Sequence, residues 1–189
     1  AARSNAGNLV PWLADVLRLD GDLVARVAAR PPGCHGLRAL PDLAGERSPN
    51  WPLAASGSLT GLRPGTTALD IAQAFIEASV CGVATAVDTL EGAVLGAGDR
   101  PPGDVTAGGL ALVGSGRSLA SSAAWRQLVA DATGRPLIPS RVEEASARGA
   151  AVVALEGLGW LDARPDDNLD GDPVLPDPGR AEAFARLRA

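Results

Sequence analysis

A glycine-rich turn with several hydroxyl groups nearby is the part of this sequence best suited to hold an anionic ligand. The turn, Gly114-Ser115-Gly116, follows a short apolar run that is typical of a strand buried on both faces, Leu110 to Val113. Glycine lets the backbone approach a ligand closely and adopt a positive φ. A helix expected from about Ser122 would point free N–H groups and the positive end of its dipole at the turn. Ser118 and Ser121 add hydroxyl groups.

This pattern alone leaves two interpretations open. The turn could cradle a phosphate or a nucleotide, or it could be a plain connection between a strand and a helix. It is not a Walker A loop, because no GKS or GKT follows, and it lacks the spacing GxGxxG. A second stretch with a glycine at an expected helix start, Ser4-Asn5-Ala6-Gly7-Asn8, offers the same choice between an anion site and an ordinary capped helix.

The elements that must position these residues alternate between helices and short strands, which predicts an α/β fold. Apolar residues at helical spacing, together with capping residues, predict helices over residues 8–19, 22–29, 66–95, 122–133, 143–157 and 180–187. Short apolar runs predict strands over residues 37–40, 110–113 and 137–138, and one hairpin around residues 58–62 within a loop from 41 to 65.

Composition excludes several classes of function. The chain has 189 residues, of which 46% are hydrophobic, and this is enough for one domain with a core. A net charge of −5 without a basic run argues against a nucleic-acid surface, and no apolar run approaches the roughly 20 residues of a membrane span. Cys34 and Cys81 make no disulfide framework, so we expect a reducing, cytoplasmic setting. Because the chain lacks Met and begins with Ala1, we expect a fragment or a processed product.

Several motifs in a fixed order resemble the C-terminal part of the FGGY family of carbohydrate kinases. Residues 57–62, followed after seven residues by residues 70–77, are similar to the family's C-terminal signature. The further matches are Leu43 to Trp51 (GERxPxW), Ser122 to Asp131 (SxxWxQxxAD), Gly134 to Leu137 and Glu144 to Ala151. The resemblance covers roughly residues 4–160, and its details are closest to gluconate-kinase-like and xylulose-kinase-like members.

The resemblance implies a ribonuclease-H-like (actin-like ATPase) domain, the C-terminal half of a two-domain sugar kinase. Residues 1–160 would be the C-terminal domain without its N-terminal part, and residues 161–189 an acidic, Pro-rich linker with a terminal helix. The whole enzyme would transfer phosphate from ATP, with Mg²⁺, to a sugar or sugar acid hydroxyl. Its catalytic aspartate and sugar site would lie in the absent part, so we expect the isolated chain to be inactive and assign it no catalytic or metal-binding residue.

The resemblance also implies roles for individual residues. Gly7 matches a glycine near the ATP phosphates, and Gly116 matches the first glycine of a nucleotide-binding pair. Arg117 stands where the second glycine belongs. The candidate nucleotide-binding residues are Gly7, Gly114, Ser115, Gly116, Arg117, Ser118, Ser121 and Ser122. Asp22 lies in a string that copies the family's GDxxA motif, but we reject it as the catalytic base because the glycine-rich continuation is missing.

Two departures from the family pattern keep other functions open. Arg117 replaces a glycine and Pro11 replaces a polar residue near the phosphates. They motivate a degenerate, non-catalytic member that binds a partner or a sugar, and a plain interaction module is a third class. ATP affinity of the full-length protein would discriminate between them. The expected partners are ATP, a sugar and the absent N-terminal domain. A homodimer through the surface left exposed stays open, and neither nucleic acid nor membrane is expected.

Overall fold

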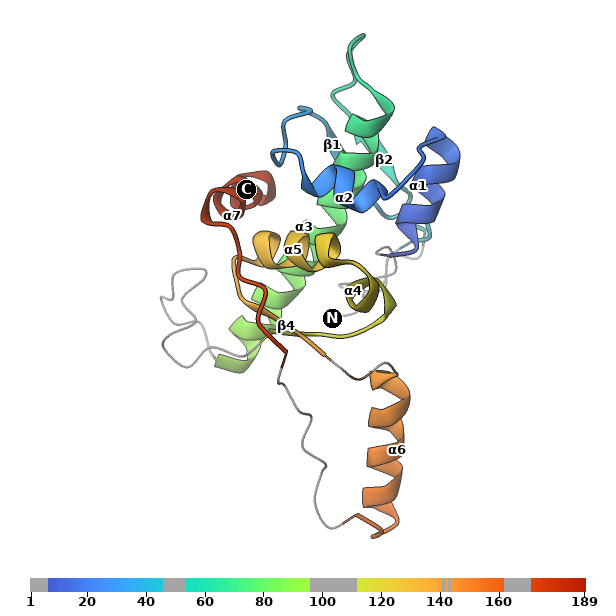
Figure 1. Cartoon of the computed structure of the whole chain (residues 1–189), viewed down its shortest axis with the longest axis vertical. Helices are drawn as coiled ribbons and strands as arrows, with labels where there is room; N and C mark the ends of the chain where they lie inside the picture. Colours follow the sequence, from blue (N-terminus) through green and yellow to red (C-terminus); the bar gives the residue numbers. More distant parts are fainter. Residues whose placement is uncertain (1–6, 46–53, 96–111, 141, 143, 162–170) are drawn as a thin grey trace.

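Figure 1 shows a computed structural model of the chain, which describes residues 7–45, 54–95, 112–140, 142, 144–161 and 171–189. The structure mixes helices with short strands, as the sequence predicts. The helices are α1 (Leu9–Leu17), α2 (Leu23–Ala28), α3 (Ala68–Leu95), α4 (Arg117–Ser121), α5 (Ala123–Thr133), α6 (Ala145–Gly157) and α7 (Pro178–Arg188). The strands are β1 (Arg38–Leu40), β2 (Ser58–Thr60), β3 (Leu112–Gly114) and β4 (Leu137–Pro139).

The described strands pair as two separate ribbons. β1 and β2 are antiparallel, with Ala39 opposite Leu59. The prediction of a hairpin around residues 58–62 is therefore wrong, because β2 pairs with a strand that lies far upstream and does not fold back on its own neighbours. β3 and β4 are parallel, with Val113 opposite Ile138. An antiparallel bridge between Leu137 and Val174 adds the segment before α7 to the other edge of β4.

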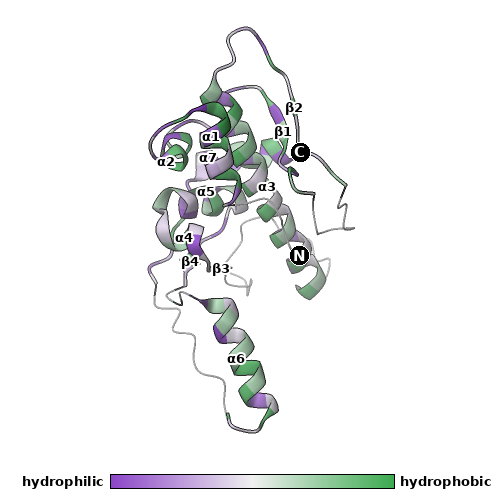
Figure 2. Cartoon of the chain, turned by 90° about the vertical axis from the view of Figure 1, so that its right-hand side faces the viewer, coloured by the Kyte–Doolittle hydropathy of each residue, from purple (hydrophilic) through white to green (hydrophobic). Residues whose placement is uncertain are grey.

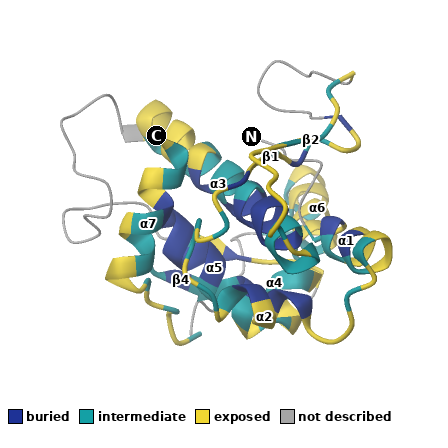
Figure 3. Cartoon of the chain, turned by 90° about the horizontal axis from the view of Figure 1, so that it is seen from above, coloured by how far each residue is buried: buried dark blue, intermediate teal, exposed yellow. Residues whose placement is uncertain are grey.

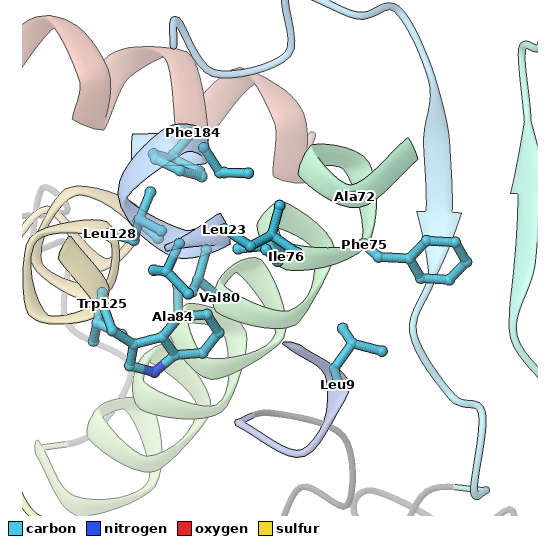
Figure 4. Packing of buried hydrophobic residues seen from close by; sticks show 14 of the residues in the cluster. Leu9, Leu23, Ala72, Phe75, Ile76, Val80, Ala84, Trp125, Leu128 and Phe184 are labelled. Carbon is cyan, nitrogen blue, oxygen red and sulfur yellow. The ribbon is translucent and has the colours of Figure 1, made fainter. Parts of the chain in front are cut away.

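The hydrophobic core surrounds α3. Its buried face carries Phe75, Ile76 and Val80, and side chains from α1, α2, α5 and α7 pack against it. Figure 4 shows Leu9, Leu23, Trp125, Leu128 and Phe184 around this face, and in Figure 3 the buried residues concentrate where α3 and α5 meet. Phe184 of α7 and Leu128 of α5 are completely buried.

The central helix is also apolar enough, by length and composition alone, to cross a membrane. Residues Ala68–Val94 form one long helical stretch, and half of its most apolar part is buried inside the described chain. The sequence pattern did not anticipate this, because charged residues interrupt the apolar ones. A buried core helix passes the same test, and the packing of α1, α2, α5 and α7 around α3 accounts for its apolar face.

Side-chain caps explain where several helices begin. The Asp22 carboxylate accepts a hydrogen bond from the N–H of Ala25 at 3.0 Å and caps α2. Thr67 and Asp70 cap α3 reciprocally, since each side chain accepts from the other's backbone N–H. Asp177 caps α7 through the N–H of Arg180 at 2.9 Å. The capping role of Asp22 agrees with its rejection as a catalytic base.

The body of α6 projects away from the other described elements in Figure 1. It has 13 residues, none of which is buried. In Figure 2 most of the α6 ribbon has the green of hydrophobic residues, with a few hydrophilic positions between them. Three large apolar side chains at and just beyond its C-terminal half are exposed: Val153 at 63%, Leu158 at 61% and Trp160 at 75%.

Candidate functional site

The glycine-rich turn lies between β3 and a short helix. Gly114 ends β3 and is buried against Leu137 and Leu119, whose nearest atoms would lie only 2.9 and 3.0 Å from an added Cβ. Gly114 therefore packs behind the turn and lets β3 approach its neighbours closely. Gly116 has φ 104° and ψ 160° and stands directly before α4. This conformation is essentially restricted to glycine, so Gly116 is required for the change of direction into α4.

The chain beyond the turn differs from the expected single helix. Instead of a loop running to Ser122, residues Arg117–Ser121 form α4. The backbone then opens at Ser122 (φ −128°, ψ 111°), and its hydroxyl accepts a hydrogen bond from the N–H of Trp125 at 3.1 Å. The helix predicted from about Ser122 is thus present and is capped by Ser122, whereas Arg117, Ser118 and Ser121 lie on a separate short helix. Arg126 ties the two helices by donating to the carbonyls of Leu119 and Ala120.

The helix start at Gly7 and the chain just beyond the glycine-rich turn meet at a small hollow. It has a volume of about 190 Å³ and is lined by Gly7, Val10, Pro11, Val24, Ser118, Ser121, Ser122 and Trp125. A Cβ at Gly7 would lie 2.0 Å from the Ser118 Oγ, so a side chain at this position would displace the Ser118 hydroxyl. Apolar walls, one indole ring and three hydroxyl groups make the hollow suitable for a flat ring that carries polar atoms.

A second, larger hollow lies against α4. It has a volume of about 660 Å³ and is lined by Ser115, Gly116, Arg117, Ala120, Ser121, Glu144, Ala145 and Ser146. Ser121 lines both hollows, and its hydroxyl donates to the Arg117 carbonyl at 2.8 Å. The exposed guanidinium of Arg117 and the backbone at Gly116 could attract an anionic group here.

The predicted site residues therefore gather around α4, with one exception. Gly7, Ser118, Ser121 and Ser122 line the small hollow, and Ser115, Gly116 and Arg117 line the large one. Gly114 lines neither and supports the turn from behind. In the described part of the chain, no three His, Cys, Asp or Glu side chains gather to hold a metal ion. These residues could contact a nucleotide, but they do not by themselves fit a protein-held Mg²⁺.

Sequence reasoning missed three side chains of the small hollow. Trp125 is 5% exposed and lines the hollow together with Val10 and Val24. The signal was present, because Trp125 stands three residues after the cap Ser122 and so belongs to the first turn of the same helix. Val10 and Val24 carry no such signal, since only the packing of α1 and α2 brings them here.

Another polar cluster, at His35, is a structural connection. Glu77 of α3 is 4% exposed and accepts hydrogen bonds from the Gly33 N–H, the Gln73 amide and His35. His35 Nδ1 accepts from the Leu37 N–H at 2.9 Å, so its Nε2 carries the proton that is donated to Glu77 at 3.1 Å. The cluster pins the loop between α2 and β1 onto α3. The nearby Cys81 thiol is partly buried, and desolvation raises its pKa to about 11.

Comparisons with known proteins identify relatives over nearly the whole chain. The model of the C-terminal domain of the FGGY family of carbohydrate kinases matches residues 1–157. The glycerol kinase of Aromatoleum aromaticum is 33% identical over 190 residues, which cover 96% of this chain and 36% of the relative. The chain thus spans about a third of the length of the curated relatives it matches.

Solved structures give the same result. The gluconate kinase of Lactobacillus acidophilus superposes with a TM-score of 0.73 at 25% identity, over 98% of this chain and 37% of that one. The xylulose kinase of Rhodospirillum rubrum superposes with a TM-score of 0.67 at 27% identity, over 98% of this chain and 36% of that one.

Proposed function

Because this chain belongs to the FGGY family of carbohydrate kinases, by the match of residues 1–157 to the family's C-terminal domain, we propose that it forms the nucleotide side of an ATP-dependent sugar kinase. The parent protein would be a phosphotransferase that acts on a hydroxyl group of a sugar or sugar acid. The observation that carries the proposal is the family match over residues 1–157. The close approach of Gly7 to Ser118 at the small hollow supports the proposal.

The nucleotide would lie against α4 and use both hollows. The proposed contacts are Gly7, Ser115, Gly116, Arg117, Ser118, Ser121 and Ser122, with Gly114 supporting the turn. Mg²⁺ would arrive with the phosphates, since the described residues offer it no cluster of ligands. Phosphoryl transfer depends mainly on positioning and charge neutralisation. The task of this chain is therefore to bind and orient the nucleotide. The rest of the protein would bind the sugar that carries the acceptor hydroxyl and would supply the base that removes its proton.

The exposed surface of α6 is an argument that the rest of the polypeptide is the main partner of this chain. A helix rich in apolar residues normally buries part of its surface against other elements, yet α6 has no buried residue here. Parallel strands such as β3 and β4 are likewise normally covered on both faces. We propose that the remaining part of the same polypeptide packs against these elements in a cytoplasmic enzyme. A homodimer through α6 would be the competing arrangement.

The test is ADP release by the full-length parent protein with ATP, Mg²⁺ and a panel of acceptors. The panel contains gluconate, xylulose, ribulose and glycerol. Turnover with one acceptor would establish the kinase and identify its substrate. Absence of turnover with every acceptor, together with absence of ATP binding in calorimetry, would reject the proposal.

A degenerate, non-catalytic member is the second candidate function. The exposed guanidinium of Arg117 at the family's glycine position and Pro11 on the wall of the small hollow favour it. The variant Arg117→Gly restores the family residue and distinguishes the two functions. A gain of ATP binding in the variant alone would mean that Arg117 blocks the site and that the natural protein is degenerate.

A further inference from the structure

The segment that follows the family match is an integral part of the fold. The match ends at residue 157, yet residues 171–189 pack closely on the domain. Val174 exchanges two backbone hydrogen bonds with Leu137 of β4, at 2.8 and 3.0 Å. Further along, Phe184 of α7 is completely buried in the core. Residues 171–189, here called the clasp, therefore extend the β4 edge and close the core.

Asp131 of α5 is the residue that holds the clasp on the domain. Its side chain is completely buried, and its carboxylate accepts three hydrogen bonds. One comes from the Gln127 amide at 2.7 Å. The others come from the clasp, namely the Asp177 N–H at 2.9 Å and the Arg180 Nε at 2.7 Å. A buried carboxylate is costly without its partners, so Asp131 depends on the clasp for its only cationic contact among the described residues.

Arg180 also contacts a second helix. While its Nε pairs with Asp131 of α5, its Nη1 donates to the Arg30 carbonyl, just after the end of α2, at 2.8 Å. Both of these helices line the small hollow. α2 contributes Val24, and α5 contributes Trp125 with its cap Ser122. Arg180, which does not line the hollow itself, thus joins two of the elements that do.

We propose that Arg180, anchored by Asp131, is a positioning residue for the small hollow, and that the clasp fixes the spacing between α2 and α5. The nature of the ligand rests on the proposed function, whereas the mechanical role of Arg180 does not. The clasp holds the walls, and Gly7, Ser118 and Trp125 face the ligand.

The variants Arg180→Met and Arg180→Lys test the role. Methionine removes both contacts but keeps an aliphatic stem. Lysine can still pair with Asp131 but cannot donate to two partners in a planar fork. Arg188→Ala is the matched control, because Arg188 lies on the same helix and pairs with Asp88 at 2.6 Å, away from the residues that line the hollow.

The measurements are MgADP affinity by calorimetry, amide hydrogen exchange and the thermal midpoint of the 189-residue chain. Below the midpoint of each variant, we expect Arg180→Met to weaken MgADP binding about tenfold and Arg180→Lys to weaken it less. Exchange in α2 and α5 should speed up together. Arg188→Ala should lower the midpoint but leave the MgADP affinity within about twofold of the natural chain.

Two results would overturn the positioning role. One is a loss of affinity that merely follows the thermal midpoint across all three variants. The other is unchanged exchange in α2 and α5 in Arg180→Met. If the natural chain binds no MgADP, the proposed nucleotide function of this chain fails, but the exchange experiment still decides the role of Arg180.

Discussion

Gly7 is the residue at which the candidate site tolerates the least change. A Cβ there would lie 2.0 Å from Ser118 Oγ and 3.1 Å from Ser118 Cβ. We expect Gly7→Ala to push α4 away, destabilise the fold by about 1–3 kcal/mol and weaken MgADP binding about tenfold, as measured by denaturant unfolding and calorimetry. Adding Ser118→Ala removes the closer contact and should restore part of both losses. Unchanged affinity in Gly7→Ala would mean that the ligand does not use this approach.

Asp70 predicts a pH-dependent contribution to stability. Hydrogen bonds from Thr67, and then the neighbouring Arg30 guanidinium, lower the pKa of the Asp70 carboxyl to about 2. Because the folded pKa is depressed, this stabilisation is present above the unfolded pKa of about 4 and is lost as pH falls towards 2. We expect Asp70→Asn to cost about 1–2 kcal/mol at pH 7 and almost nothing at pH 2.

Unfolding by denaturant at several pH values measures this difference. Asp172→Asn, at an exposed position before α7, is the control and should change stability little at either pH. A constant cost of Asp70→Asn across the range would assign its effect to packing rather than to charge.

Local chemistry let the sequence predict the start of α5 well. A helix is expected from about Ser122, and in the structure α5 begins there with the Ser122 hydroxyl as its cap. Trp125 was harder, because an indole ring three residues after a cap fits either a core or a hollow. Only the packing of α1 and α2 shows that it serves both.

The start of α5 allows a capping role to be separated from a ligand role. Ser122→Ala removes the hydrogen bond to the Trp125 N–H, and we expect a loss of about 1 kcal/mol in thermal or denaturant unfolding. Ser122→Asp keeps a good cap, so stability should be retained while a negative charge enters the small hollow. MgADP binding should then fall in Ser122→Asp. If affinity is unchanged in that variant, Ser122 acts only as a cap.

Short elements limited prediction at this scale. α4 has five residues and begins after Gly116, which has no side chain to cap it. A helix of about one turn shows no periodicity and depends on tertiary contacts. The pairing of β1 with β2 is equally invisible locally, because a strand of three residues does not specify its partner. The long α3 was predicted because its capping residues and extended apolar face are local signals.

At the scale of the whole molecule, amino-acid composition did not predict which helix is buried: α7 closes the core, and α6 stays outside it. α7 reads as polar, yet it buries Phe184 and holds Asp131 through Arg180. α6 reads as apolar, yet none of its residues is buried. The burial of each helix depends on the element that packs against it. α7 finds its partner within this chain, and the partner of α6 lies, in our proposal, in the remaining two thirds of a kinase of the relatives' length.

The exposed face of α6 gives the prediction that tests the whole molecule. Val153 is 63% exposed in this chain, so Val153→Glu should change its stability by no more than about 0.5 kcal/mol. In the full-length parent the same side chain would lie in a packed interface, and burying an unpaired carboxylate there should cost several kcal/mol. Thermal unfolding of both proteins, each with and without the substitution, measures the difference, and the isolated chain is the control. Equal small effects in both proteins would leave α6 exposed in the whole enzyme. A loss of self-association in the isolated chain would instead assign this face to a homodimer, because a second copy would then be what covers it.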